Sequence, residues 1–227
     1  MISNYIVLSS KVWNVDLVEK LKVYAPESNW HYISKKEDFN KETLERIKPD
    51  KVFIPHWSYI IPESVFLNFD CVVFHMTDLP YGRGGSPLQN LIANGLEHTK
   101  ISAIKVVKEL DAGPIYLKSD LSLYGTAEEI LIRANNVIFN MIIKIKDENP
   151  QLTEQEGEIT SFKRRTPKMS SMEDLNELED IFRHIRMLDA DGYPHAYLET
   201  ENFKLEFTRA SLKADKSIIA DVRITKK

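Results

Sequence analysis

The sequence predicts an α/β fold: a mostly parallel sheet flanked by helices, with a small C-terminal α+β appendage. Short apolar runs that resemble buried strands alternate with amphipathic helical patterns over the first two thirds of the chain. Such alternation indicates βαβ units, whose strands lie parallel and are joined by right-handed crossovers. Beyond this region the pattern changes to one helix followed by short β-like runs. We therefore expect a main domain over residues 1–160 and a small subdomain over 161–227.

In the first half, the apolar runs predict strands at residues 5–9, 30–33, 51–55 and 71–74. Apolar residues at helical spacing predict a helix over 15–23 that Pro26 ends, and a short helix near 44–47 that Pro49 closes.

In the second half, a helix is expected from Leu88 to Gly95, where the glycine ends it. Strands are expected at 100–107 and 115–117. Thr126 and Glu129 form a capping box that predicts a long amphipathic helix running toward Pro150. The appendage is expected to hold a helix over 172–188 and strands at 196–199, 203–207 and 218–222.

Composition limits the class of protein. The chain has 227 residues, 43% of them hydrophobic and 28% charged, as in an ordinary globular protein, and its formal net charge is −4. An acidic total argues mildly against a nucleic-acid substrate, although it can conceal a local basic patch. The single cysteine, Cys71, excludes an internal disulfide and a multi-cysteine zinc site. No signal peptide or membrane-spanning run is visible, so we expect a cytoplasmic protein without a membrane partner.

A glycine-rich stretch after the fourth predicted strand marks the candidate site. Five of the eight glycines lie between Gly82 and Gly113, and the same region contains His75, Arg83 and Asp111. Glycine in such density indicates backbone that turns sharply or approaches a ligand closely. Arg83, placed among these glycines, has a guanidinium that suits a carboxylate or phosphate.

Two histidines follow neighbouring predicted strands. His75 comes directly after the strand at 71–74, and His56 directly after the strand at 51–55. Ligands of open α/β sheets bind outside the carboxyl ends of the strands, which favours a catalytic role over simple strand capping, more for His75 than for His56. Asp111 by spacing alone is an ordinary turn residue, but beside an imidazole it would form a proton-transferring pair.

These residues resemble the formyltransferase family that uses 10-formyltetrahydrofolate. The resemblance rests on the run from His75 to Pro87, on Asn94-Gly95 and Thr99, and on Leu110-Asp111-Ala112-Gly113, with the family's spacing between His75 and Asp111. The segment Arg164-Arg165-Thr166-Pro167 also resembles one found downstream of the catalytic domain in several members.

The resemblance implies a Rossmann-like catalytic domain, transfer of a formyl group to a primary amine, and no metal. It makes His75 the general base or electrostatic partner, oriented by Asp111. It implies two further sets of residues. The folate would lie against Trp57, Ser58, Tyr59, Lys108, Glu109 and Leu110, and the acceptor against Thr77, Tyr81, Arg83 and Gly84.

One position departs from the family motif. The family has an asparagine two residues before the histidine, and Val73 stands there in this chain. Valine cannot donate a hydrogen bond to an oxyanion, and loss of one such donor costs about two to three orders of magnitude in rate. The candidate substitutes are His56, Asn90 and the Thr77 hydroxyl. We favour His56 because its strand end should face the same crevice.

The short appendage, with its mixed charges, resembles that of sugar N-formyltransferases. The sequence thus predicts a nucleotide-linked amino sugar as the acceptor, no nucleic-acid partner, and a homodimer. Two alternatives remain open: a formyltetrahydrofolate hydrolase, and a non-catalytic folate- or nucleotide-binding module. The sequence does not identify the sugar, its nucleotide or the substitute for the asparagine.

Overall fold

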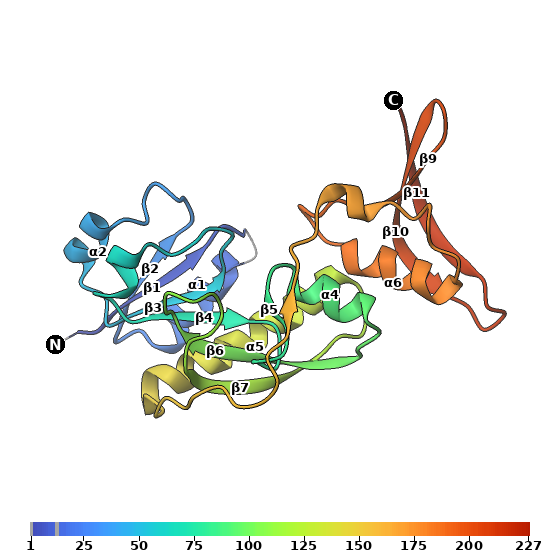
Figure 1. Cartoon of the computed structure of the whole chain (residues 1–227). Helices are drawn as coiled ribbons and strands as arrows, with labels where there is room; N and C mark the ends of the chain where they lie inside the picture. The colour runs from blue at the N-terminus through green and yellow to red at the C-terminus, as the bar shows by residue number, and fades with distance from the viewer. Residues whose placement is uncertain (1, 12–13) are drawn as a thin grey trace. The chain divides into compact units, whose positions relative to one another are not determined.

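A six-stranded sheet forms the centre of the larger part of the molecule (Figure 1). Its strands lie in the order β2 (Asn29–Ile33), β1 (Asn4–Ser9), β3 (Lys51–His56), β4 (Cys71–His75), β6 (His98–Lys105) and β7 (Ile115–Ser122). The first four are parallel to one another, and β6 pairs antiparallel with β4. The computed structural model therefore confirms the mostly parallel sheet.

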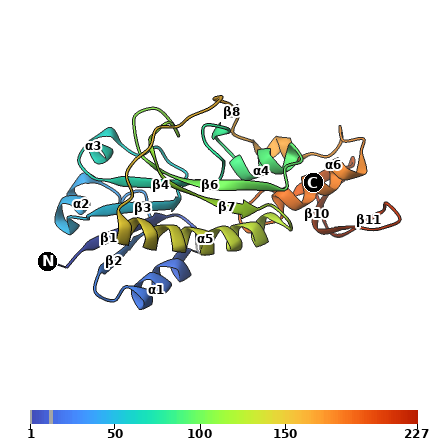
Figure 2. The same ribbon diagram turned by 90° about the horizontal axis from the view of Figure 1, so that it is seen from below.

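Helices cover both faces of this sheet (Figure 2). Helices α1 (Asn14–Tyr24) and α5 (Ala127–Glu148) lie on one face, and α2 (Lys41–Ile47) and α3 (Glu63–Phe66) on the other. Alternate residues of β1 point to opposite faces, as expected for a strand between two helical layers. Ile6 belongs to the cluster that contains Leu44 of α2 and Val65 of α3, whereas Tyr5 packs against Trp30 and Phe53.

The structure describes residues 2–11 and 14–227, which divide into two compact units. The first unit holds the chain up to Arg83, Lys100–Leu121 and Ile132–Ser161. The second holds Gly84–Thr99, Ser122–Leu131 and Phe162–Lys227, so it includes two segments from the first 160 residues besides the predicted appendage. Two short strands, β5 (Arg83–Gly84) and β8 (Ser161–Phe162), pair with each other.

The second unit combines two helices with an antiparallel sheet. Its helices are α4 (Pro87–Ala93) and α6 (Leu178–Leu188), and its sheet has the order β11 (Ile218–Lys226), β10 (Phe203–Leu212), β9 (Ala196–Glu199). Helix α6 packs against both α4 and β10. Arg186 of α6 donates to the carbonyls of Leu123 and Gly125, at 2.6 and 2.9 Å, and so ties α6 to the start of α5.

Two predicted helix ends are present. The capping box forms at the start of α5: the Thr126 hydroxyl accepts from the Glu129 amide, and the Glu129 carboxylate accepts from the Thr126 amide. Gly95 follows α4 with a φ of +76° and donates its amide to Ile92, which is how a glycine ends a helix. In the part of the chain that the structure describes, no helix combines the length and the apolar character that crossing a membrane requires.

The helix predicted over 172–188 is shorter than expected. A 3-10 helix, η1 (Pro167–Ser170), precedes it, and α6 begins only at Leu178. The reason is that Met172 is buried and donates its amide to the carbonyl of Tyr197, in β9, at 2.9 Å. That amide is engaged with the sheet and the segment stays non-helical, although its apolar residues have helical spacing.

We expect His184 of α6 to make the stability of the protein depend on pH. Burial, followed by the charge of Arg165, lowers the pKa of His184 from 6.5 to about 4. As pH falls below 6.5 the unfolded chain binds a proton that the native protein excludes until about pH 4, so stability is full above 6.5 and declines toward pH 4. The loss should be of the order of 2–3 kcal/mol.

Urea unfolding between pH 7.5 and 4.5 measures this loss. His184→Leu should weaken the dependence, whereas His98→Ala, which removes an exposed histidine of the same unit, should leave it unchanged. If the free energy of unfolding changes equally with pH in all three proteins, His184 is not the source of the pH dependence.

Candidate active site

The candidate site lies at the carboxyl end of β4, within the first unit. β4 ends at His75, whose side chain is only 7% exposed. Strands β3 and β4 pair in parallel as far as Ile54 and Val73, and each ends two residues later, at His56 and at His75. The two histidines therefore end neighbouring strands, as the sequence predicted.

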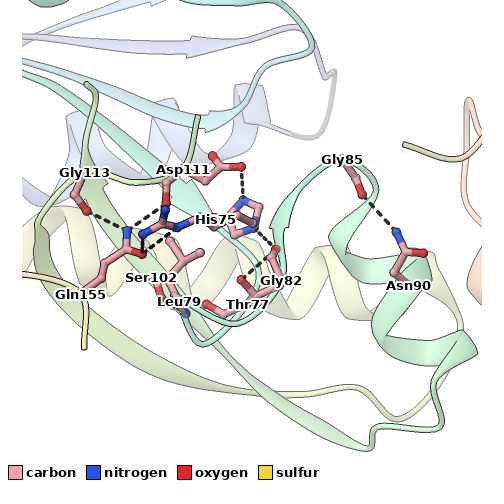
Figure 3. A network of polar contacts seen from close by, with 11 residues as sticks. His75, Thr77, Leu79, Gly82, Gly85, Asn90, Ser102, Asp111, Gly113 and Gln155 are labelled. Carbon is pink, nitrogen blue, oxygen red and sulfur yellow. Dashed lines mark hydrogen bonds and ion pairs between the residues drawn. The ribbon is translucent and has the colours of Figure 1, made fainter. Parts of the chain in front are cut away.

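His75 has a neighbour on each side of its ring (Figure 3). Its Nε2 lies 2.8 Å from the carbonyl oxygen of Gly82, and its Nδ1 lies 3.6 Å from Oδ2 of Asp111. A carbonyl only accepts hydrogen bonds, so Nε2 must carry a proton. The position at Nδ1, which faces a carboxylate, is the one where the pair can take up or release a further proton.

The turn after β4 is held by buried hydrogen bonds. The Ser102 hydroxyl donates to the carbonyl of Thr77 at 2.7 Å and accepts from the amide of Leu79. Lys118 lies 2.5 Å from the carbonyl of Leu79. The Thr77 hydroxyl donates to the Gly82 carbonyl at 3.4 Å, and Thr77 is fully buried, so this hydroxyl is a poor candidate for the missing oxyanion donor.

Asp111 lies in a tight turn between β6 and β7. Its φ is +53°, in the left-handed region that few non-glycine residues adopt. Gly113 is pressed against β6, because a Cβ added to it would stand 1.7 Å from the carbonyl oxygen of Lys105. The predicted turn therefore requires glycine at position 113, because a side chain there would collide with β6.

Gln155 holds this turn from outside (Figure 3). Its Nε2 donates to the carbonyls of Asp111 and Gly113, at 2.8 and 2.9 Å. Its Oε1 accepts from Nε and Nη2 of Arg83, at 3.1 and 2.8 Å. Nothing in the sequence singles out Gln155, which lies in an acidic segment without a recognisable motif.

Arg83 is engaged by groups of the protein itself. Besides Gln155 it contacts Oε1 of Glu109 at 3.3 Å, and its side chain is only 12% exposed. The Glu109 side chain is 77% exposed, so this ion pair contributes little. Arg83 was predicted to bind the acceptor. In this structure its guanidinium holds Gln155, and acceptor binding stays a prediction.

His56 has the properties of a neutral donor. Burial, with a smaller contribution from the charge of Lys11, lowers the pKa of His56 to about 4. Its imidazole is thus uncharged at neutral pH. Val73, the position of the missing asparagine, packs instead against Leu79, Ile104 and Ile115.

Asn90 and Gly84 belong to the second unit. The Asn90 amide nitrogen lies within hydrogen-bonding distance of the carbonyl of Gly85 (Figure 3) and of the carbonyls of Ser86 and Lys163, at 2.9 to 3.2 Å. Its donors are therefore in use, which makes Asn90 a poor candidate for the oxyanion donor. Gly84 has a φ of +102°, and a Cβ there would stand 2.5 Å from the Phe162 carbonyl oxygen.

Most residues predicted to contact folate are exposed. Trp57 and Tyr59 form an edge-to-face pair with ring centroids 5.3 Å apart, and Tyr59 is 48% exposed. Leu110, next to Asp111, is 58% exposed, and Ser58, Lys108 and Glu109 are exposed as well. Tyr81, predicted to contact the acceptor, is half-buried. Within the described ranges no cluster of three or more potential metal ligands occurs.

Comparison with known proteins gives consistent matches. A family model described as methionyl-tRNA formyltransferase, C-terminal domain, matches residues 167–225. Methionyl-tRNA formyltransferase of Thermotoga maritima is 31% identical over 189 residues, which cover 79% of this chain and 58% of that protein. The chain thus spans about three fifths of the length of this curated relative.

Two solved structures share the fold, one at high and one at low sequence identity to this chain. Methionyl-tRNA formyltransferase from Clostridium thermocellum superposes with a TM-score of 0.96 and 48% identity, covering all of both chains. A sugar N-formyltransferase from Shewanella sp. has a TM-score of 0.69 and 15% identity, over 96% of each chain. The likeness to the second shows the fold alone.

These matches contradict two predictions. The amino-sugar acceptor is wrong, because the full-length match at 48% identity is a methionyl-tRNA formyltransferase and the sugar enzyme is a distant neighbour. The exclusion of a nucleic-acid partner is wrong for the same reason. Both predictions relied on the small size and mixed charge of residues 161–227, the region that the C-terminal domain model matches.

Gly113→Ala tests whether the Asp111 turn depends on its contact with β6. The added methyl group would collide with the Lys105 carbonyl, so the free energy of unfolding should fall by about 1–3 kcal/mol or more. Ala112→Ser, at the neighbouring half-buried position, should cost much less. Chemical denaturation measures both, and a Gly113→Ala protein as stable as the parent would mean that the turn shifts freely.

Proposed function

The chain belongs to the methionyl-tRNA formyltransferase family, and from this we propose that it transfers a formyl group from 10-formyltetrahydrofolate to the amino group of methionyl-tRNA. The observation that carries this proposal is the 48% identity with a methionyl-tRNA formyltransferase over the whole of both chains. The pairing of His75 with Asp111 supports it, since acyl transfer to an amine requires a group that moves a proton. The proposed substrate is a component of translation, in accord with the predicted cytoplasmic location.

A local basic segment supports a nucleic-acid substrate despite the net charge of −4. Four of the six residues from Lys163 to Lys168 are cationic, and Lys163, Arg164 and Lys168 are exposed. No ion pair among the described residues neutralises these three side chains. Unpaired surface cations are what a phosphate backbone binds.

The first unit suits a folate. A flat, aromatic pterin requires apolar side chains that it can contact, and the exposed Tyr59 and Leu110 provide them, with the half-buried Trp57 beside Tyr59. These are the residues that we expect to hold the cofactor. When bound, the cofactor would supply an activated formyl group, and its N10 would take up the proton that the amine loses as the formyl group is transferred.

The chain's own residues then have three tasks. His75 accepts the proton that the amine loses, at Nδ1, while the Gly82 carbonyl keeps Nε2 protonated. Asp111 stabilises the imidazolium so formed and keeps the ring oriented. A neutral donor must stabilise the negative charge that develops on the formyl oxygen, and His56 is our choice because its imidazole stays uncharged.

The purified protein should formylate methionyl-tRNA, separated from its product on acid gels, when 10-formyltetrahydrofolate is supplied. His75→Ala should lower kcat by about 10²- to 10⁴-fold, and Asp111→Asn should also lower it, because both remove part of the proton-transfer pair. His98→Ala is the matched control and should keep full activity.

Nucleotide amino sugars serve as competing acceptors in the same assay and should remain unmodified. Formylation of a sugar would contradict the proposed function. Release of formate without an acceptor, with no formyl-methionyl-tRNA formed, would contradict it as well.

His56→Ala should lower kcat by about 10²- to 10³-fold and leave folate binding unchanged, because it removes a donor to the developing charge. The ratio of the parent kcat to the variant kcat should be the same from pH 6 to pH 8, because a pKa of about 4 keeps His56 neutral throughout that range. His31→Ala on β2 is the control. Parental rates in His56→Ala would remove His56 from the mechanism.

A further inference from the structure

We propose that Gln155 is a positioning residue, which holds Asp111 and Gly82 on the two sides of the His75 ring. The loss of rate that we expect rests on the proposed function, whereas the expected change at the His75 imidazole does not. The segment that carries Gln155 shows a contrast. Glu154 and Glu156, on either side, are exposed, whereas Gln155 is half-buried.

The Gln155 amide has every polar position in use. Both donors of Nε2 are directed at carbonyls of the Asp111 turn, and Oε1 accepts two hydrogen bonds from Arg83. A side-chain amide offers two donors and one oxygen with two lone pairs, so no capacity is left over. Such complete use indicates a fixed side chain and not a solvated loop residue.

These contacts form a closed chain of interactions that begins and ends at the imidazole of His75. Starting from His75, Nε2 bonds to Gly82, which is joined covalently to Arg83, and Arg83 bonds to Gln155. Gln155 bonds to the backbone of Asp111, whose carboxylate returns to Nδ1 of His75. Both neighbours of the imidazole are thus linked through one glutamine.

The Asp111 turn needs this support. The left-handed backbone of Asp111 is strained for a residue other than glycine, and hydrogen bonds to the turn stabilise it. The two bonds from Gln155 therefore offset a cost that the turn would otherwise relieve by relaxing. Relaxation would move the Asp111 carboxylate from Nδ1, and a misplacement of about 1 Å at a reacting group costs up to about 100-fold in rate.

Gln155→Met, a substitution of similar length without polar atoms, tests the proposal. Its kcat should fall between about 10- and 100-fold with the KM values for folate and tRNA nearly unchanged. Glu156→Gln, next to it on the same loop, should behave as the parent protein. Unchanged kcat in Gln155→Met would overturn the proposal.

A double-mutant cycle with Asp111→Asn separates positioning from a general structural effect. If Gln155 acts through Asp111, adding Gln155→Met to Asp111→Asn should cause little further loss. If the double variant loses kcat by the product of the two single losses, the proposal is overturned. Should Gln155→Met fail to fold, Gln155→Glu removes the two donors to the Asp111 turn and keeps oxygens that Arg83 can contact. It should then show the same split between kcat and KM.

A measurement without turnover keeps this proposal distinct from the proposed function. The ¹⁵N signals of the His75 ring report where its protons lie, and they should change in Gln155→Met but not in Glu156→Gln. Unaltered ring signals would overturn the role of Gln155 even in an active enzyme. Altered signals in a protein that formylates no tRNA would support Gln155 and refute the function.

Discussion

The imidazole of His75 keeps one orientation only while the groups beside it stay in place, and the rest of the site depends on this constraint. Gly82 follows β4, whereas Asp111 lies in the turn between β6 and β7. Because β6 runs antiparallel to β4, its last residue, Lys105, lies opposite Val72 near the start of β4, and the chain folds back from there to bring Asp111 to His75. The position of the carboxylate thus depends on the turn that follows β6 and on the contacts that hold this turn.

Much of this fold could be predicted because it depends on local patterns. Apolar runs gave the parallel strands, and the capping box at Thr126 gave the start of α5. The false extension of α6 shows the limit of such patterns: Met172 has helical spacing, yet its amide bonds to Tyr197. A contact across 25 residues leaves no mark on local periodicity.

The site was predictable only in part, for the same reason. His75 and Asp111 stand at positions that strand ends and a family resemblance both indicate. Gln155 acts through contacts with Arg83 and Asp111, 72 and 44 residues away, and nothing in its own segment signals them. The acceptor was misjudged because the net charge describes the whole chain, whereas a phosphate backbone meets only a local surface such as residues 163–168.

In the proposed mechanism, Val73 is the reason why the site uses two histidines with different surroundings. One group must carry a proton during the reaction, and another must donate a hydrogen bond to a developing negative charge without itself becoming charged. His75, facing the Asp111 carboxylate, suits the first task, and His56, kept neutral by burial, suits the second. Strands β3 and β4 are neighbours and end at these two histidines, so in the proposed mechanism the donor comes from the strand next to the one that carries Val73.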